Sequence, residues 1–482
     1  MPIKKPSSFI TFLPIIFSVL YWCFLYFNAS PQIIFDAIGI ESSAQKIHTL
    51  GWQSYFITEP PREPIYPFLI YFSIRLADFF AVPYLNIQIF LQLLIMLITQ
   101  ILLLNLLKKL KIHVSIIFGT VLYFGISPAM INSAFSLFTE IATYPFVFAI
   151  LFSSFLAWKK IKTATSSQAF FYAFLLGISF ALNTFVKAIF SYILILFLIP
   201  FVIRAILFFI HKDKVALRNS LIIIIGSAIT LNMLMIPYKN LNKKFNGNYV
   251  FTSRGPWLLF GNTAKRVQDI TPKDIAVNAV FTLGDNLCFD IFHTPCSKWN
   301  LPVVENLGNV KRNELEKSIC NNSCLTSQLQ VDSGLMKESL KITLQKPIQY
   351  GLLYTIEAFK IFFWESTRIG CVTYPGWLET IYENKLFKNA IRLLISLLSM
   401  MAFFHVIKQL WKDRQSIFNP QSDFQPEIIY KMLVVLLILS FLLIQNFFYI
   451  LARYVFPIAP LFLVCIAIFI NDMRGKKPAH SK

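Results

Sequence analysis

Long apolar runs recur along the chain and alternate with short polar segments. A run of about 20 apolar residues is long enough to cross a bilayer as an α-helix. We predict ten membrane-spanning helices from these runs. They cover residues 9–29, 84–107, 114–131, 140–158, 167–186, 189–210, 219–237, 388–410, 428–447 and 453–471.

Two further apolar stretches, 65–81 and 348–366, carry charged residues within them. A charge at the centre of a bilayer costs about 2.5–3.5 kcal/mol on the insertion scale. We therefore expect both stretches to be helices that lie at the outer membrane interface, with one polar and one aromatic face.

The composition agrees with this pattern. Of 482 residues, 56% are apolar and 14% are charged, whereas soluble domains have roughly 45–50% and 25%. A soluble protein would need more polar cover, and a disordered chain would contain fewer aromatic residues. We predict an all-α polytopic membrane protein with a mixed extracytoplasmic domain.

The formal charge is +20, which is also typical of nucleic-acid-binding proteins. Here, however, the basic residues gather in six short segments, and most of these adjoin the ends of the predicted spans. Lysine and arginine at such positions stay in the cytoplasm, and all six segments do so if both termini are cytoplasmic. We therefore expect a multi-pass protein of the cytoplasmic (inner) membrane that contacts membrane lipids and binds no nucleic acid. The first span is expected to be an uncleaved signal anchor.

This topology divides the chain into three parts. Residues 1–237 form an N-terminal transmembrane module that includes the first outer loop, 30–83. Residues 238–387 form a large extracytoplasmic domain, and residues 388–482 form C-terminal transmembrane helices with a cytoplasmic tail.

Five of the seven cysteines lie in the extracytoplasmic domain, where disulfides are permitted. The simplest pairing joins Cys288 to Cys296 and Cys320 to Cys324 and leaves Cys371 outside both pairs, although spacing alone does not fix it. Neither spacing is Cys-x-x-Cys, and we expect no metal site. The sequence also lacks a Walker loop and the HExxH and GxSxG motifs, so nucleotide-driven transport and zinc or serine hydrolysis have no support.

Two acidic residues stand at the outer membrane boundary. Asp36 follows the first span and precedes a short helix predicted from Ile38 to Leu50, which Gly51 ends. Glu140 begins the fourth span. Acids at such positions are candidates for function, and a structural ion pair is the alternative interpretation.

Four basic residues are also expected on the outer side, where the positive-inside rule does not favour them. Guanidinium and ammonium groups at headgroup depth suit a lipid-linked phosphate or pyrophosphate. The alternative is that each side chain extends to the lipid headgroups. These residues are Arg62, Lys187, Arg254 and Arg453.

Several segments together resemble the integral-membrane GT-C glycosyltransferases, in particular the protein O-mannosyltransferase-like group that includes the bacterial aminoarabinose transferase. The resemblance rests on their order and placement along most of the chain. The segments are Asp36 with Ala44 and Gly51, Arg62-Glu63-Pro64-Ile65-Tyr66-Pro67, Ser127-Pro128 with Glu140, Pro237-Tyr238-Lys239-Asn240, Val250 to Asn262, and Arg453-Tyr454 with Pro457 and Pro460.

The resemblance implies a transferase that moves a sugar from a polyprenyl-phosphate donor to a glycan, lipid or protein acceptor outside the membrane. It implies Asp36 as the general base and Glu140 as the residue that orients the base or the acceptor. Many members have a second acid directly after the aspartate, whereas Ala37 stands here, so Glu41 is an alternative base. The four basic residues would bind the donor phosphate, and Tyr66 and Tyr454 would line the substrate cavity. We expect no cofactor.

Two other classes of function remain open. A polymerase or ligase of lipid-linked glycans has a similar membrane body and relies on arginines and a histidine in its large loop, where His293 is the one histidine. A lipid or solute transporter would also use aromatic spans and boundary charges.

Overall fold

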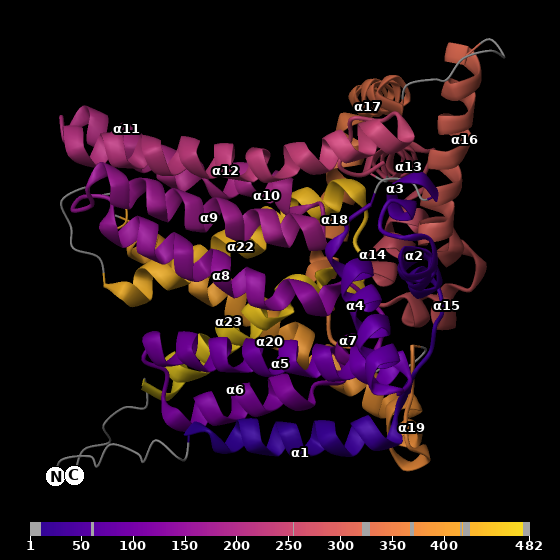
Figure 1. The fold of residues 1–482 in the computed structure, drawn as a ribbon, viewed down its shortest axis with the longest axis horizontal. Coiled ribbons are helices and arrows are strands. Elements are labelled where there is room, and N and C mark those ends of the chain that lie inside the picture. The colour runs from indigo at the N-terminus through magenta and orange to yellow at the C-terminus, as the bar shows by residue number, and fades with distance from the viewer. Residues whose placement is uncertain are drawn as a thin grey trace.

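The computed structural model describes residues 11–58, 62–253, 255–320, 328–366, 371–414, 417 and 425–475. Long helices run side by side through most of the molecule, and shorter helices gather at one end of this bundle (Figure 1). We call that end the outer end.

The bundle consists of apolar helices. In the described part of the chain, eight helices are long and apolar enough to cross a membrane, and the bent pair α6–α7 makes a ninth. A further apolar helix, α1, is shorter. The bundle helices are α1 (Leu13–Asn28), α5 (Tyr84–Lys109), α6 (Val114–Ile126), α7 (Pro128–Phe135), α8 (Glu140–Lys160), α9 (Ser166–Val186), α10 (Phe190–Phe197), α11 (Ile199–Ile210), α12 (Lys214–Asn246), α20 (Lys385–Lys412), α22 (Pro426–Phe448) and α23 (Ala459–Gly475), with the 3-10 helix η4 (Arg453–Ile458) before α23.

All ten predicted runs are helical over most of their described residues, and the multi-pass class is therefore confirmed. Two details differ from the prediction. Helix α12 does not end at Pro237 but continues to Asn246. The predicted span 114–131 is not straight, because the chain bends by 43° between α6 and α7.

The bend between α6 and α7 has a local cause and a distant one. Pro128 has no N–H, and the Ser127 hydroxyl caps the new helix by accepting from the N–H of Met130. The carboxylate of Glu365 accepts hydrogen bonds from the Ser127 hydroxyl at 2.7 Å and from the Ala129 N–H at 2.9 Å. Glu365, a buried acid far along the chain, therefore accepts hydrogen bonds from the polar groups at the start of α7.

The outer end is built from the first loop and from residues after α12. The extracytoplasmic domain that we predicted as mixed is helical in its described residues, and its one strand, β2 (Val372–Thr373), pairs antiparallel with β1 (Ser30–Pro31). The first-loop helices are α2 (Asp36–Leu50), α3 (Ser54–Thr58) and α4 (Ile65–Phe80). The later elements are α13 (Gly255–Val267), α14 (Pro272–Leu283), α15 (Asp285–Phe292), η2 (Thr294–Trp299), α16 (Leu301–Cys320), α17 (Gln328–Gln345), α18 (Pro347–Ala358), η3 (Phe359–Phe362) and α19 (Gly376–Glu383).

The two predicted interface segments lie at this outer end (Figure 1). The first is the helix α4, and it is not among the helices suited to span a membrane. The second is helical only in part: α18 ends at Ala358, η3 follows, and residues 363–366 are irregular. This irregular stretch contains Glu365, which contacts the start of α7.

The described residues contain the predicted disulfide between Cys288 and Cys296, which joins α15 to η2. The other predicted pairing, between Cys320 and Cys324, lies outside the residues whose side chains are described. Cys288 and Cys296 are buried in a small apolar cluster with Val277, Phe281 and Trp299.

The basic ends of α5 and α8 lie at the end of the bundle opposite the outer domain, as does the end of α23 (Figure 1). This arrangement agrees with the distribution that led us to predict cytoplasmic termini. The orientation in the membrane remains a prediction.

A buried polar network joins the outer domain to the end of α22. Glu357 in α18 accepts from Arg266 at 2.6 Å and from Lys265 at 2.8 Å, and all three residues are buried. Arg266 also donates to the backbone oxygen of Asn446 at 2.8 Å. The last carbonyls of a helix lack hydrogen-bond partners within it. Arg266 of the outer domain therefore provides a donor for one of these carbonyls in α22.

This network shifts the ionisation of its members. Burial opposes ionisation of Glu357, but the charges of Arg266 and Lys265 outweigh burial and lower the pKa of Glu357 to about 2. Burial lowers the pKa of Lys265 to about 8, and the carboxylate of Glu357 only partly offsets this effect. The network therefore depends on one carboxylate that supports two buried cations.

Candidate active site

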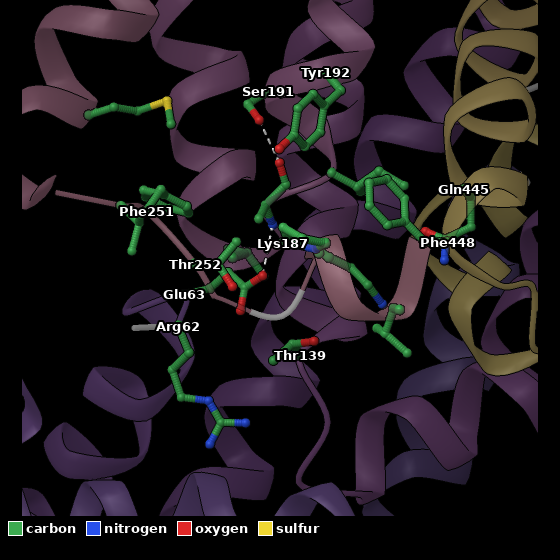
Figure 2. Close-up of a pocket in the computed structure, with 18 of the residues that line it drawn as sticks. Arg62, Glu63, Thr139, Lys187, Ser191, Tyr192, Phe251, Thr252, Gln445 and Phe448 are labelled. Atoms are coloured by element: carbon green, nitrogen blue, oxygen red, sulfur yellow. Dashed lines mark hydrogen bonds between the residues drawn. The ribbon is translucent and has the colours of Figure 1, made fainter. Parts of the chain in front are cut away.

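A cavity of about 670 Å³ lies where the bundle meets the outer domain. Its lining comes from α2, the α9–α10 junction, α12, α17, the end of α22 and the start of η4. Figure 2 shows Lys187 within this lining, with Tyr192, Phe251 and Phe448 on the surrounding walls. The cavity therefore has both charged and aromatic walls.

Asp36 enters the cavity as the first residue of α2. The preceding residue, Phe35, has φ 53°, a backbone conformation that side-chain-bearing residues rarely adopt. The chain turns sharply here, and Arg453 donates a hydrogen bond to Oδ2 of Asp36. At the other end of α2, Gly51 has φ 85° and ends the helix as predicted.

Glu140 lies at the start of α8, and its side chain is 3% exposed. Its Oε1 is 2.8 Å from Nζ of Lys187 and 3.7 Å from Nε of Arg453. Arg453 therefore lies between the two predicted acids, Asp36 and Glu140. The four residues form a chain of alternating charge, Asp36–Arg453–Glu140–Lys187, which we call the charge cluster.

Aromatic rings cover the two cations of the charge cluster. The guanidinium of Arg453 is 4.2 Å from the ring centre of Phe138, and Nζ of Lys187 is 5.1 Å from that of Tyr454. Contacts of this kind attract the cation to the face of the ring. The cluster thus combines ion pairs with an aromatic environment.

Lys187 lies where the chain breaks between α9 and α10. The next residue, Ala188, donates its N–H to Oε1 of Glu63 at 3.0 Å (Figure 2). The side chain of Glu63 thus joins the first loop to the junction between α9 and α10 by a hydrogen bond.

Arg62 also lines the cavity, but its backbone holds the first loop against other segments. Its backbone oxygen accepts from the hydroxyls of Tyr55, at 2.7 Å, and Tyr238. Its guanidinium lies beside α2, where a Cβ added to Gly39 would be 3.4 Å from Nη1. In Figure 2 the Arg62 side chain extends away from that of Glu63.

The structure brings most of the predicted site residues together. Asp36, Glu140, Arg62, Lys187, Arg453 and Tyr454 line the cavity, and Arg254 lies outside the described residues.

Two predicted site residues contact other parts of the protein. Glu41 accepts from the hydroxyl of Tyr84 in α5 and is not part of the cavity lining. Tyr66 is fully buried and donates to Oε1 of Gln92 at 2.6 Å, and burial raises its pKa well above the ordinary value. His293, the histidine of the polymerase alternative, is also absent from the lining.

Three charged lining residues were not predicted as site residues: Glu63, Lys239 and Asp332. Glu63 and Lys239 stand in segments that carry the family resemblance, so a signal was present for them. Asp332, which is buried in α17, stands in no recognisable motif.

An apolar wall completes the cavity on the side of the bundle. It comes from α10 and α12, and both helices also present exposed apolar side chains, among them Ile195, at 68%, and Met233, at 65%. Exposed apolar side chains on helices that are apolar enough to span a membrane suit contact with lipid. The residues of this wall are Tyr192, Leu194, Ile195, Ala228, Leu231 and Met235.

No protein-family model matches the chain, and comparison with curated proteins gives no match. Functional inference therefore depends on the geometry of the cavity and on the chemistry of its side chains. Within the described residues, no group of three or more His, Cys, Asp or Glu side chains is arranged to hold a metal ion.

Proposed function

We propose that the protein is a glycosyltransferase that moves a sugar from a polyprenyl-phosphate donor to an acceptor on the outer side of the membrane. One observation carries this proposal: a cluster of ion-paired carboxylates and cations shares a cavity with an apolar wall of two membrane helices. A lipid-linked sugar phosphate has the matching parts, an isoprenoid chain, an anionic group and a polar sugar.

The carboxylates suit the chemistry of transfer. The acceptor oxygen bonds to the anomeric carbon, and the bond from that carbon to the phosphate oxygen breaks, its electron pair leaving with the phosphate. The hydroxyl proton passes to a carboxylate within hydrogen-bond reach. A single displacement of this kind inverts the anomeric centre.

Asp36 is the better base of the two acids in the charge cluster. Its side chain is 42% exposed and has room for an acceptor, whereas that of Glu140 is 3% exposed and contacts two cations. Arg453 donates a hydrogen bond to Oδ2 of Asp36 and so fixes the orientation of this carboxylate. Glu140 then orients Arg453 and, through it, the base.

The family resemblance supports the same assignment. Its segments are far apart in the sequence, yet Asp36, Arg62, Glu140, Arg453 and Tyr454 all line one cavity. Fixed cations near a leaving phosphate stabilise its growing charge, and the described lining contains four cationic side chains.

The test compares Asp36→Asn and Glu140→Gln with wild type and with a deletion strain. After normal accumulation in the membrane is verified, the envelope glycans are compared by mass spectrometry. Asp36→Asn should match the deletion, and Glu140→Gln should retain a small fraction of transfer. Asp78→Asn, an exposed acid of α4 outside the lining, is the matched control and should match wild type.

Two outcomes would contradict the proposal. If Asp36→Asn retains full transfer, the base lies elsewhere, and Glu41→Gln becomes the next variant to compare. If the deletion leaves every envelope glycan unchanged, the protein is not a transferase of this kind.

A further inference from the structure

Lys239 differs from the other cations of the cavity. In the described chain, Lys187 and Arg453 each contact carboxylates of the charge cluster, whereas Lys239 has no acidic partner. Its Nζ lies 5.8 Å from the ring centre of Tyr249. Among the described residues, no carboxylate forms an ion pair with the charge of Lys239.

The backbone on both sides of Lys239 is held in place. Tyr238 donates its hydroxyl to the backbone oxygen of Arg62, and Asn242 donates to the backbone oxygen of Val250 at 2.8 Å. These bonds fix α12 against the first loop and against the segment that follows α12. Lys239 is half-buried between these contacts and lines the cavity, so its backbone position at the cavity wall is fixed.

An anion would bind at lower cost to Lys239 than to Lys187 or Arg453, the two cations of the charge cluster. Binding at Lys187 or Arg453 would require the anion to compete with Glu140 or Asp36, leaving a carboxylate without its charge partner. Binding at Lys239 displaces no carboxylate. Of these three cations, Lys239 is therefore the one that an anion binds at the lowest cost.

The apolar wall continues from Lys239 along the same face of α12. Residues three and four positions apart share a helix face, so Met235 and Leu231 follow Lys239 toward the middle of the bundle, and both line the cavity. An anion at Lys239 could thus carry a long apolar chain along α12 without crossing the charge cluster.

We propose that Lys239 binds the phosphate of the lipid-linked donor, a proposal that rests on the function proposed above. The isoprenoid chain lies along Met235 and Leu231, and the sugar extends toward Asp36. Lys187 and Arg453 then hold the two acids in position and do not provide the first contact with the phosphate.

The shared chemistry of possible ligands is a phosphate group, which inorganic phosphate and phospholipid headgroups also carry. The experiment therefore uses the purified full chain in detergent and measures the binding of decaprenyl phosphate by thermophoresis. Decaprenol, inorganic phosphate and phosphatidylglycerol are measured in parallel. The variants are Lys239→Gln and Lys239→Arg, with Lys244→Gln, an exposed lysine of α12 outside the lining, as the control.

A hydrogen bond to a charged group accounts for roughly 10- to 100-fold in affinity. Lys239→Gln should weaken decaprenyl phosphate binding by this factor and leave decaprenol binding unchanged. Lys239→Arg should retain most of the affinity, which shows that the fold is intact, and Lys244→Gln should bind as wild type does.

The outcomes distinguish a failure of the proposed function from a failure of the assignment of Lys239 as the phosphate site. If wild type binds decaprenyl phosphate no more tightly than decaprenol, the proposed function itself is wrong. If wild type distinguishes the two ligands and Lys239→Gln does so equally well, the donor is bound but Lys239 is not its phosphate site. Equal affinity for inorganic phosphate or for phosphatidylglycerol would overturn the assignment of a polyprenyl carrier.

Discussion

Substitution of Glu357 by glutamine should loosen the outer domain from the bundle. Glu357 is the carboxylate that supports Lys265 and Arg266, at 2.8 and 2.6 Å, in a buried site. Glutamine has nearly the same shape but no charge, so two buried cations would lose their partner. Breaking a buried ion pair by removing one charge costs about 3–5 kcal/mol.

The shift in the pKa of Glu357 corresponds to a free energy of the same order. Its pKa is lowered from an ordinary 4.5 to about 2, and at about 1.4 kcal/mol for each pKa unit this corresponds to about 3 kcal/mol. Because the folded-state pKa is lowered, this stabilisation is complete above about pH 4.5 and is lost as the pH falls toward 2. The difference between wild type and Glu357→Gln should therefore shrink over that range.

Hydrogen–deuterium exchange of the purified protein measures the expected loosening. Peptides of α13 and α18 should exchange about 100-fold faster in Glu357→Gln near neutral pH, because about 3 kcal/mol corresponds to this factor. Glu314→Gln is the control, since Glu314 forms an exposed ion pair with Lys311 and such pairs contribute less than about 1 kcal/mol. Adding Lys265→Met to Glu357→Gln should slow the exchange again.

Equal exchange of α13 and α18 in Glu357→Gln and Glu314→Gln would refute this reasoning. A difference that stays constant down to pH values near 2 would show that the charge of Glu357 is not its cause.

Three further predictions concern single contacts. Replacing Cys288 and Cys296 by serine should lower the free energy of unfolding of the outer domain by about 2.5 kcal/mol, because the bridge spans 8 residues; thermal melting with and without reductant measures this. Tyr449→Phe removes a buried hydrogen bond of 2.8 Å to the outer domain and should cost about 1 kcal/mol in the same assay. Asp36→Asn should abolish transfer yet tighten the binding of decaprenyl phosphate severalfold, because a carboxylate in contact with Arg453 loses its negative charge; unchanged or weaker binding would contradict this.

The pattern of apolar residues was sufficient to predict the bundle, because a spanning helix needs only a long apolar run. The pattern was less informative where helices continue outside that run. Helix α12 extends to Asn246 because Tyr238 and Asn242 are buried against other segments. Contacts of this kind depend on residues far away in the sequence.

The sequence was sufficient to predict which residue types the candidate site contains. It was not sufficient to predict which acid contacts which partner. Asp36 and Glu41 stand on the same helix, and sequence could not distinguish them as bases. Five residues turn an α-helix by about 140°, so the two acids point in different directions. Glu41 therefore contacts Tyr84, whereas Asp36 contacts Arg453.

The bend between α6 and α7 bears on how the protein is assembled. The ribosome makes α7 long before it makes Glu365, yet Glu365 supplies the acceptors for Ser127 and Ala129. During synthesis these donors must bind water or lipid headgroups until some 230 further residues have been added. The amino-terminal half can thus be inserted early but reaches its final form only after translation has passed the outer domain.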